Sequence, residues 1–152
     1  MKSILITGAS SGIGQATAEV FLDAGWRVGL VARRADKLED VAAGREAAVV
    51  LPADVTAAAA RDGAYSRFVD VAGRLDVLFN NAGTFGIPGA IDDIGVSDFD
   101  EVVNVNLRGM LIAARAAVIQ MRHQSPAGGR IINNGSLSAS VPRAGSVSYT
   151  TM

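Results

Sequence analysis

Five short apolar runs, separated by stretches with a helical pattern, constrain the fold of this 152-residue chain more than any other feature. The runs occupy residues 4–6, 28–31, 48–51, 77–79 and 131–132. Strands that alternate with helices in this way build a parallel sheet with helices on both faces. The sequence therefore predicts a doubly wound, Rossmann-like α/β fold with five strands, in a single domain spanning residues 1–152.

Helical patterns fill the intervals between the runs. Three shorter helices are predicted over residues 13–24, over residues 35–43 and between Thr56 and Gly73, and each ends before a glycine, as helices often do. A longer helix is predicted to open at a capping pair, Ser97 and Asp100, and to end before residue 125. Its predicted buried face consists of Phe99, Val102, Val103, Met110, Leu111, Ala114, Val118 and Met121.

Composition excludes several classes of protein. The net charge of −1 offers no broad positive field for nucleic acid or an anionic membrane. There is no cysteine and His123 is the only histidine, so thiolate and His-rich metal sites are excluded. Arg115 and Gln120 interrupt the longest apolar region, which predicts that no segment spans a membrane and that the protein is cytoplasmic.

Residues 7–14 read Thr-Gly-Ala-Ser-Ser-Gly-Ile-Gly and follow the first apolar run directly. Gly8 permits a sharp exit from the strand, Gly12 lets the backbone approach a pyrophosphate, and Gly14 lets the helix pack close to the strand. The helix N-terminus then offers free N–H groups to an anion. A plain structural turn is the alternative, but a strand before and a helix after favour a dinucleotide-binding site.

Arg33 and Arg34 follow the second run, where many NAD-binding sheets place an acidic residue against the ribose hydroxyls. Arginine at this place meets a 2′-phosphate with charge-assisted hydrogen bonds, which favours NADP. The alternative is two solvated arginines at the start of a helix.

Polar and small residues follow the third and fourth runs, at the sheet edge where ligands bind. Asp54 and Val55 come after the third run, and the motif Asn80-Asn81-Ala82-Gly83 comes after the fourth. A carboxylate and a small-residue turn at this edge could hold an adenine ring and let a cofactor pass close to the backbone. The alternative is that these are ordinary loop residues without a role in binding.

Three further side chains could carry chemistry. Asn106 lies beside the apolar stripe of the long helix, so its amide needs partners, and a structural buried Asn is the alternative. Ser136 follows the fifth run, and Tyr149 lies 149 − 136 = 13 residues later, so a hydroxyl and a phenol could converge on one carbonyl. A Ser-His-Asp arrangement is excluded because His123 is interpreted as a surface residue.

Together these motifs resemble the short-chain dehydrogenase/reductase family from Lys2 onwards. The resemblance implies hydride transfer between the nicotinamide of NADP, with NAD as the alternative, and a small carbonyl or alcohol substrate. It also implies that an intact member forms a homo-oligomer, usually through the long helix and its successor. The implied cofactor-binding residues are Thr7, Gly8, Ser10, Ser11, Gly12, Ile13, Gly14, Arg33, Arg34, Asp54, Val55, Asn80, Ala82 and Gly83.

The same resemblance implies catalytic roles for Asn106, Ser136 and Tyr149. Ser136 would hydrogen-bond the substrate oxygen, and Tyr149 would donate or accept the proton of that oxygen. Asn106 would hold a helix distortion and an ordered water in the proton relay. The cofactor carries the hydride, while the protein supplies position and handles the proton.

The family motif Tyr-x-x-x-Lys is the one departure, because the printed sequence stops immediately before the position of the lysine. A free phenol has a pKa of about 10, and a nearby ammonium favours its ionised form. We therefore expect an amino-terminal, incomplete part of a reductase, inactive or severely impaired as given. A non-catalytic dinucleotide-binding or sensing protein and a structural or partner-binding fragment remain the alternatives.

Overall fold

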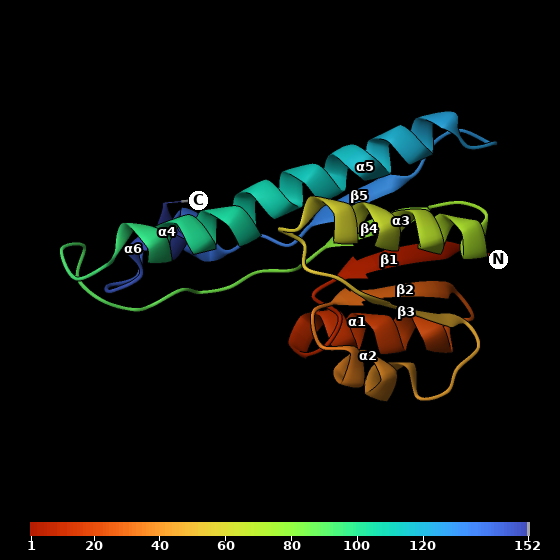
Figure 1. The fold of residues 1–152 in the computed structure, drawn as a ribbon, viewed down its shortest axis with the longest axis horizontal. Helices are drawn as coiled ribbons and strands as arrows, with labels where there is room; N and C mark the ends of the chain where they lie inside the picture. The colour runs from red at the N-terminus through yellow and green to blue at the C-terminus, as the bar shows by residue number, and fades with distance from the viewer. Residues whose placement is uncertain (152) are drawn as a thin grey trace.

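The computed structural model describes residues 1–151. Figure 1 shows one sheet with helices on both of its faces. The strands are β1 (Ser3–Thr7), β2 (Arg27–Ala32), β3 (Ala48–Pro52), β4 (Val77–Asn80) and β5 (Arg130–Asn133). The helices are α1 (Gly12–Asp23), α2 (Ala35–Ala42), α3 (Ala58–Ala72), α4 (Val96–Val103), the π-helix η1 (Asn104–Gly109), α5 (Met110–His123), the 3₁₀-helix η2 (Leu137–Ala139) and α6 (Val147–Thr150).

The strands run parallel in the order β3-β2-β1-β4-β5. The chain moves outward from β1 to β3 and then crosses back to β4, so a topological switch point lies between β1 and β4. Ligands of open α/β sheets bind outside the carboxyl ends of the strands at such a point. The predicted doubly wound α/β fold is confirmed, and each predicted strand lies within an observed one.

Two apolar layers enclose the sheet. Alternate residues of a strand face opposite sides, so Ile4 and Ile6 pack with α1 and α2, whereas Leu5 packs with α3 and α5. Figure 1 shows these two pairs of helices on opposite faces of the sheet. The three predicted shorter helices are confirmed as α1, α2 and α3, with ends that differ by one or two residues.

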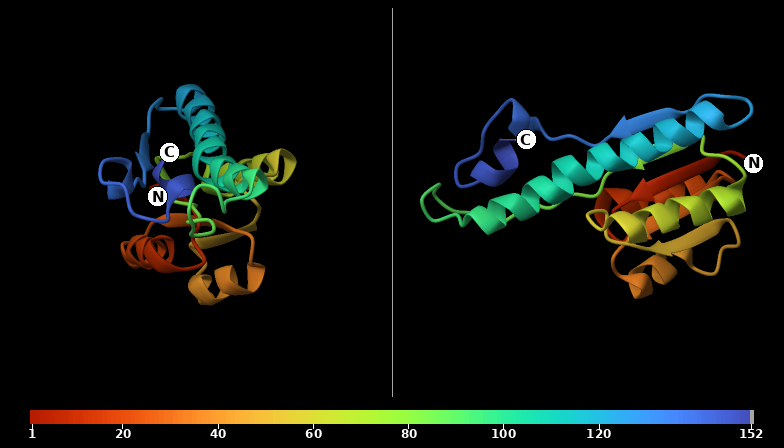
Figure 2. Two further views of the ribbon diagram at one scale, coloured as in Figure 1. Left: turned by 90° about the vertical axis from the view of Figure 1, so that its left-hand side faces the viewer. Right: turned by 45° about the horizontal axis from the view of Figure 1, so that its top comes forward.

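The segments α4, η1 and α5 form one continuous helix, whose α4 end extends beyond the sheet and lies beside α6 (Figure 2). The prediction that Ser97 caps this helix is wrong, because the helix begins at Val96 and extended Gly95 is its N-cap. Asp98, rather than Asp100, places its carboxylate beside Gly95.

The buried face of the long helix also differs from the predicted one. Ala113 and Ala117 are buried together with Met121, whereas Leu111 and Val118 are exposed. The prediction followed the large apolar side chains, but small alanine side chains let α5 lie close to the sheet. Leu111 and Val118 therefore point outward, whereas the predicted Val102 and Met121 are buried.

The helix Val96–His123 is long and apolar enough to cross a membrane by length and composition alone, with a mean hydropathy of 1.5 in its most apolar window. The charge of Arg115 does not prevent this, contrary to the argument from sequence. Core helices of soluble proteins meet the same criterion, and Ala113 and Ala117 pack into the core beneath the helix. The helix is therefore weak evidence for a membrane span.

Candidate active site

The turn between β1 and α1 has the backbone shape that its glycines predict. Gly8 and Gly12 have φ angles of 69° and 56°, a region that residues with a Cβ avoid. α1 begins at Gly12, and Ser11 is its extended N-cap without a side-chain capping bond. The first N–H groups of α1, with the positive end of the helix dipole, therefore form a place for an anion.

Gly14 and Gly8 allow a close approach of three backbone segments. A Cβ on Gly14 would overlap the carbonyl oxygen of Gly8 and lie 2.7 Å from Nδ2 of Asn81. A Cβ on Gly8 would lie 2.9 Å from Cα of Ala82. The segments can lie this close because Gly8 and Gly14 carry no side chain, and this close packing, here called the glycine cradle, is what a dinucleotide-binding turn requires.

Thr7 is fully buried at the end of β1 and holds the loop after β4. Its Oγ1 accepts hydrogen bonds from the N–H groups of Asn81 at 2.9 Å and Ala82 at 3.0 Å. Nδ2 of Asn81 donates to the carbonyl of Thr7 at 3.1 Å, and its Oδ1 accepts from Nδ2 of Asn134 at 2.9 Å. These bonds join the ends of β1, β4 and β5. The side chain of Thr7 therefore holds the loop after β4 against the glycine turn.

Charged side chains from the loops after β2 and β3 lie beside the glycine turn. Nη2 of Arg34 donates to Oγ of Ser10 at 3.4 Å. Asp54 accepts hydrogen bonds from the N–H of Thr56 at 2.8 Å and from its hydroxyl at 2.7 Å. The N–H of Thr56 is the main cause that lowers the pKa of Asp54; burial opposes it, while the Thr56 hydroxyl and the charge of Arg33 lower the pKa further.

A cavity of about 340 Å³ brings these segments together at the carboxyl edge of the sheet. The sequence-predicted residues that line it are Gly8, Ser10, Ser11, Arg33, Arg34, Asp54, Val55, Ala82 and Gly83. The predicted residues that do not line it are Thr7, Gly12, Ile13, Gly14 and Asn80. Gly12, Ile13 and Gly14 form the first turn of α1 beside the cavity, whereas Thr7 and Asn80 are buried.

Asn80 ties the sheet to the long helix. Its Nδ2 donates to the carbonyl oxygen of Met110 at 2.7 Å and to Oδ1 of Asn133 at 3.2 Å. Asn81, the next residue, lines the cavity instead. Asn80 is the last residue of β4, whereas Asn81 begins the loop that borders the cavity.

Asn106 lies in η1, where the long helix takes the π form. Its Oδ1 accepts from the N–H of Thr84 at 2.8 Å, and its Nδ2 donates to the carbonyl of Thr84 at 2.8 Å. The helix distortion that the family resemblance implies at this residue is therefore present. The amide uses both of its functions to fix the loop after β4.

Ser136 and Tyr149 come from segments that contact each other, because α6 packs against η2 directly after Ser136. Oγ of Ser136 accepts a hydrogen bond from the N–H of Ser138 at 3.1 Å. The ring of Tyr149 lies 5.1 Å from the ring of Phe85. Phe85 follows Thr84, so consecutive residues of one loop contact Asn106 and Tyr149.

The cofactor-binding residues that the resemblance implies do not include several residues that line the cavity, among them Asn81, Thr84, Glu101 and Val105. The motif Asn80-Asn81-Ala82-Gly83 was the signal for Asn81, because it follows a strand at the edge where ligands bind. Glu101 and Val105 belong to α4 and η1, and no local pattern indicates that this helix passes over the cavity.

A parallel sheet with a glycine cradle at its switch point, and with amide, hydroxyl and phenol groups beyond it, is the arrangement of a Rossmann-like nucleotide-binding protein. The family model described as short chain dehydrogenase matches residues 2–152. The chain therefore belongs to the short-chain dehydrogenase/reductase family, as its motifs indicate.

Curated relatives agree with this assignment. An uncharacterized oxidoreductase of Staphylococcus aureus is 36% identical over 139 residues, which cover 90% of this chain and 59% of the relative. Momilactone A synthase of Oryza sativa is 41% identical over 159 residues, which cover 99% of this chain and 55% of that protein. The chain thus spans little more than half the length of these relatives.

Solved structures show the same fold. A 3-ketoacyl-(acyl-carrier-protein) reductase from Brucella melitensis, complexed with NADH, superposes with a TM-score of 0.93 at 31% identity, covering 99% of this chain and 63% of that one. An NAD⁺-bound xylitol dehydrogenase superposes with a TM-score of 0.89 at 31% identity, covering 99% and 58%.

Proposed function

We propose that the protein transfers hydride between the nicotinamide of NAD(P) and the carbon of a small carbonyl or alcohol substrate. The observation that carries this proposal is a series of residue contacts that links the cavity at the carboxyl edge of the sheet, here called the nucleotide cavity, to Tyr149. The cavity wall includes Thr84, Thr84 pairs with Asn106, and the adjacent Phe85 packs on Tyr149. The loop after β4 thus contacts both the cavity and the ring of Tyr149.

The residues divide the chemistry as follows. NAD(P), when bound, supplies or accepts the hydride. The hydroxyl of Ser136 would donate a hydrogen bond to the substrate oxygen, and the phenol of Tyr149 would give that oxygen a proton during reduction and take it back during oxidation. Asn106 would keep η1 in its π form and hold a water in the proton relay.

NADPH-dependent reduction of small aldehydes and ketones by a protein that includes the lysine of the family motif, followed by the loss of NADPH absorbance, tests the activity. Tyr149→Phe and Ser136→Ala should each lower kcat by on the order of a hundredfold or more, because each removes a group that handles the substrate oxygen. Ser140→Ala, at an exposed serine after η2, is the matched control and should leave kcat unchanged. Full activity in both site variants would refute these roles.

A polypeptide that stops at residue 152 carries no lysine four residues after Tyr149. We expect such a polypeptide to bind the nucleotide but to reduce carbonyls about a hundredfold more slowly than a protein with that lysine, because an ammonium favours the phenolate. Equal rates would show that the lysine is dispensable. Tight nucleotide binding without turnover in the lysine-bearing protein would instead favour a sensing role.

NADP is the proposed cofactor, with NAD as the alternative, and Arg33 supports this choice. Arg33 lines the nucleotide cavity beside Asp54. It follows β2, and the ribose of a bound dinucleotide lies near the end of that strand in this fold. Arg33→Ala should weaken NADPH binding about tenfold and leave NADH binding unchanged, because it removes a charge-assisted contact to the phosphate. Arg122→Ala, at the far end of α5, is the control.

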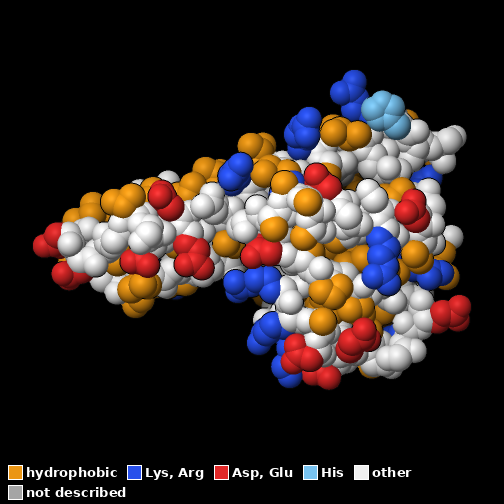
Figure 3. Space-filling view, viewed as in Figure 1, with side chains coloured by type: hydrophobic (Ala, Val, Ile, Leu, Met, Phe, Trp, Pro, Cys, Tyr) orange, Lys and Arg blue, Asp and Glu red, His pale blue; other side chains and the backbone are white. Residues whose placement is uncertain are grey.

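Association into a cytoplasmic homo-oligomer is proposed on the family resemblance. The outward side of α5 carries Leu111 and Val118, which are 67% and 42% exposed. Figure 3 shows hydrophobic side chains gathered along the long helix. Sedimentation of Leu111→Glu tests this proposal: dissociation of a wild-type oligomer supports it, and a wild-type monomer contradicts it.

A further inference from the structure

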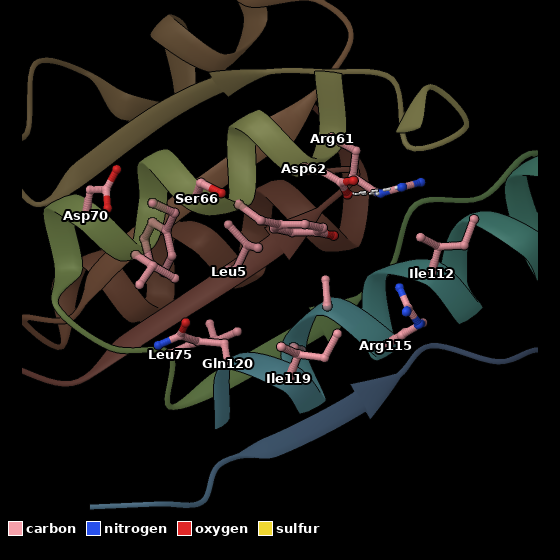
Figure 4. Close-up of a pocket in the computed structure, with 15 residues that line it drawn as sticks. Leu5, Arg61, Asp62, Ser66, Asp70, Leu75, Ile112, Arg115, Ile119 and Gln120 are labelled. Atoms are coloured by element: carbon pink, nitrogen blue, oxygen red, sulfur yellow. Dashed lines mark hydrogen bonds and ion pairs between the residues drawn. The ribbon is translucent and has the colours of Figure 1, made fainter. Parts of the chain in front are cut away.

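A second cleft lies between α3 and α5 (Figure 4). Its volume is about 430 Å³, within the range of small-molecule sites. It shares no lining residue with the nucleotide cavity. The wall is largely apolar and includes Leu5, Phe68, Leu75, Ile112 and Ile119.

Tyr65 is a polar group in this apolar wall. Its side chain is 8% exposed, and its hydroxyl has no hydrogen-bond partner among residues 1–151. Buried hydroxyl groups nearly always have a partner, because an unpaired one loses the hydrogen bonds that water provides in the unfolded chain. Burial raises the pKa of Tyr65, so the phenol keeps its proton and remains a donor. A bound acceptor would satisfy it.

Positive charge gathers at one end of the cleft. Figure 4 shows Arg61 and Asp62 of α3 and Arg115 of α5 at this end, while Asp70 lies at the other. Arg61 is 2% exposed and pairs with Asp62 at 3.1 Å, so these two charges compensate each other. The guanidinium of Arg115 has no ion pair within the described part of the chain. This end therefore carries one uncompensated positive charge.

We propose that the cleft binds a small organic carboxylate with an apolar body. The carboxylate accepts hydrogen bonds from the hydroxyl of Tyr65 and the guanidinium of Arg115. The apolar body lies along the wall toward Ile119 and Leu75. This site is independent of the proposed reductase function, since the two cavities have no residue in common.

Calorimetric titration of the purified protein with 2-naphthoate tests the proposal, with NADPH present to occupy the nucleotide cavity. Tyr65→Phe and Arg115→Gln should each weaken 2-naphthoate binding about tenfold or more, because each removes a hydrogen bond to a charged group. Arg67→Gln, at an exposed arginine of α3 outside the cleft, should leave the affinity unchanged. The neutral analogue naphthalene-2-carboxamide should bind about tenfold more weakly than 2-naphthoate.

The melting temperature of each variant distinguishes loss of 2-naphthoate binding from misfolding. Tyr65→Phe removes an unpaired buried hydroxyl, so its melting temperature should equal or exceed that of the wild type while its affinity falls. Unchanged affinity in Tyr65→Phe and Arg115→Gln, or equal affinity for the amide, would overturn the proposal. The proposal would also be overturned if the wild type did not bind 2-naphthoate and Ile119→Glu abolished self-association. That result would show that a second copy of the chain covers the cleft.

Discussion

The nucleotide turn and the segments that carry Ser136 and Tyr149 are held in place in different ways. All residues of β1 are buried, whereas all residues of β5 are half-buried or exposed. The glycine turn is shaped by its own backbone and by hydrogen bonds from the neighbouring strand. Tyr149 lies in a helix of four residues and packs on Phe85 from a distant loop. The backbone shape of the glycine turn is thus set by residues adjacent in sequence, while the placement of Tyr149 depends on a contact with a distant loop.

The largest expected effect concerns the glycine turn. Gly14→Ala forces a Cβ against the carbonyl of Gly8, so it should destabilise the fold by about 1–3 kcal/mol and weaken NADPH binding on the order of a hundredfold. Gly63→Ala is the matched control, because Gly63 also lies within a helix but has open space around it. It should stabilise the fold by about 0.5–1 kcal/mol. Thermal unfolding and nucleotide titration measure both, and equal behaviour of the two variants would contradict the cradle.

The second effect tests the long-range contacts. Asn106→Leu leaves the N–H and the carbonyl of Thr84 without their side-chain partner, which should cost about 2 kcal/mol of unfolding free energy. Asn104→Leu, in the same π-helix but without a side-chain hydrogen bond among the described residues, should cost less than about 1 kcal/mol. Denaturant unfolding compares them. Similar losses would show that Asn106 does not hold the loop.

The smallest effect concerns the amino ends of β1 and β4, where Asp76 accepts hydrogen bonds from the N–H of Ser3 at 2.8 Å and from Nε of Arg74 at 2.7 Å. Burial alone would raise the pKa of Asp76, but the bond from Ser3 and the charge of Arg74 outweigh it and lower the pKa. The ionised carboxylate therefore stabilises the fold at pH above about 4, and this contribution is lost as the pH falls through the lower pKa of the folded state.

Asp76→Asn should reduce stability by about 1 kcal/mol at neutral pH. The difference from the wild type should shrink below pH of about 4, because the carboxylate of the unfolded chain is protonated there first, and should vanish as the pH falls through the lower pKa of the folded protein. Denaturant titrations from acidic to neutral pH measure this difference, and Asp92→Asn at an exposed loop position is the control. A difference that stays constant across this range would contradict the argument.

The comparison also explains what the sequence could predict. The strands, the glycine turn and the place of Asp54 follow from periodicity and from residues adjacent in sequence, so they could be predicted. The distinction between Asn80 and Asn81, the start of α4 at Val96 and the buried alanines of α5 depend on neighbours distant in the chain. The cleft beside Tyr65 forms only when α3 and α5 pack together, and no motif indicates it.

Titration of the nucleotide-free protein with NADPH and with NADH tests the central claim most directly. The glycine cradle predicts that both nucleotides bind, and Arg33 predicts that NADPH binds about tenfold more tightly, because only its 2′-phosphate makes the charge-assisted contact. If the folded protein bound neither NADPH nor NADH, the assignment of the cavity as a nucleotide-binding site would be contradicted.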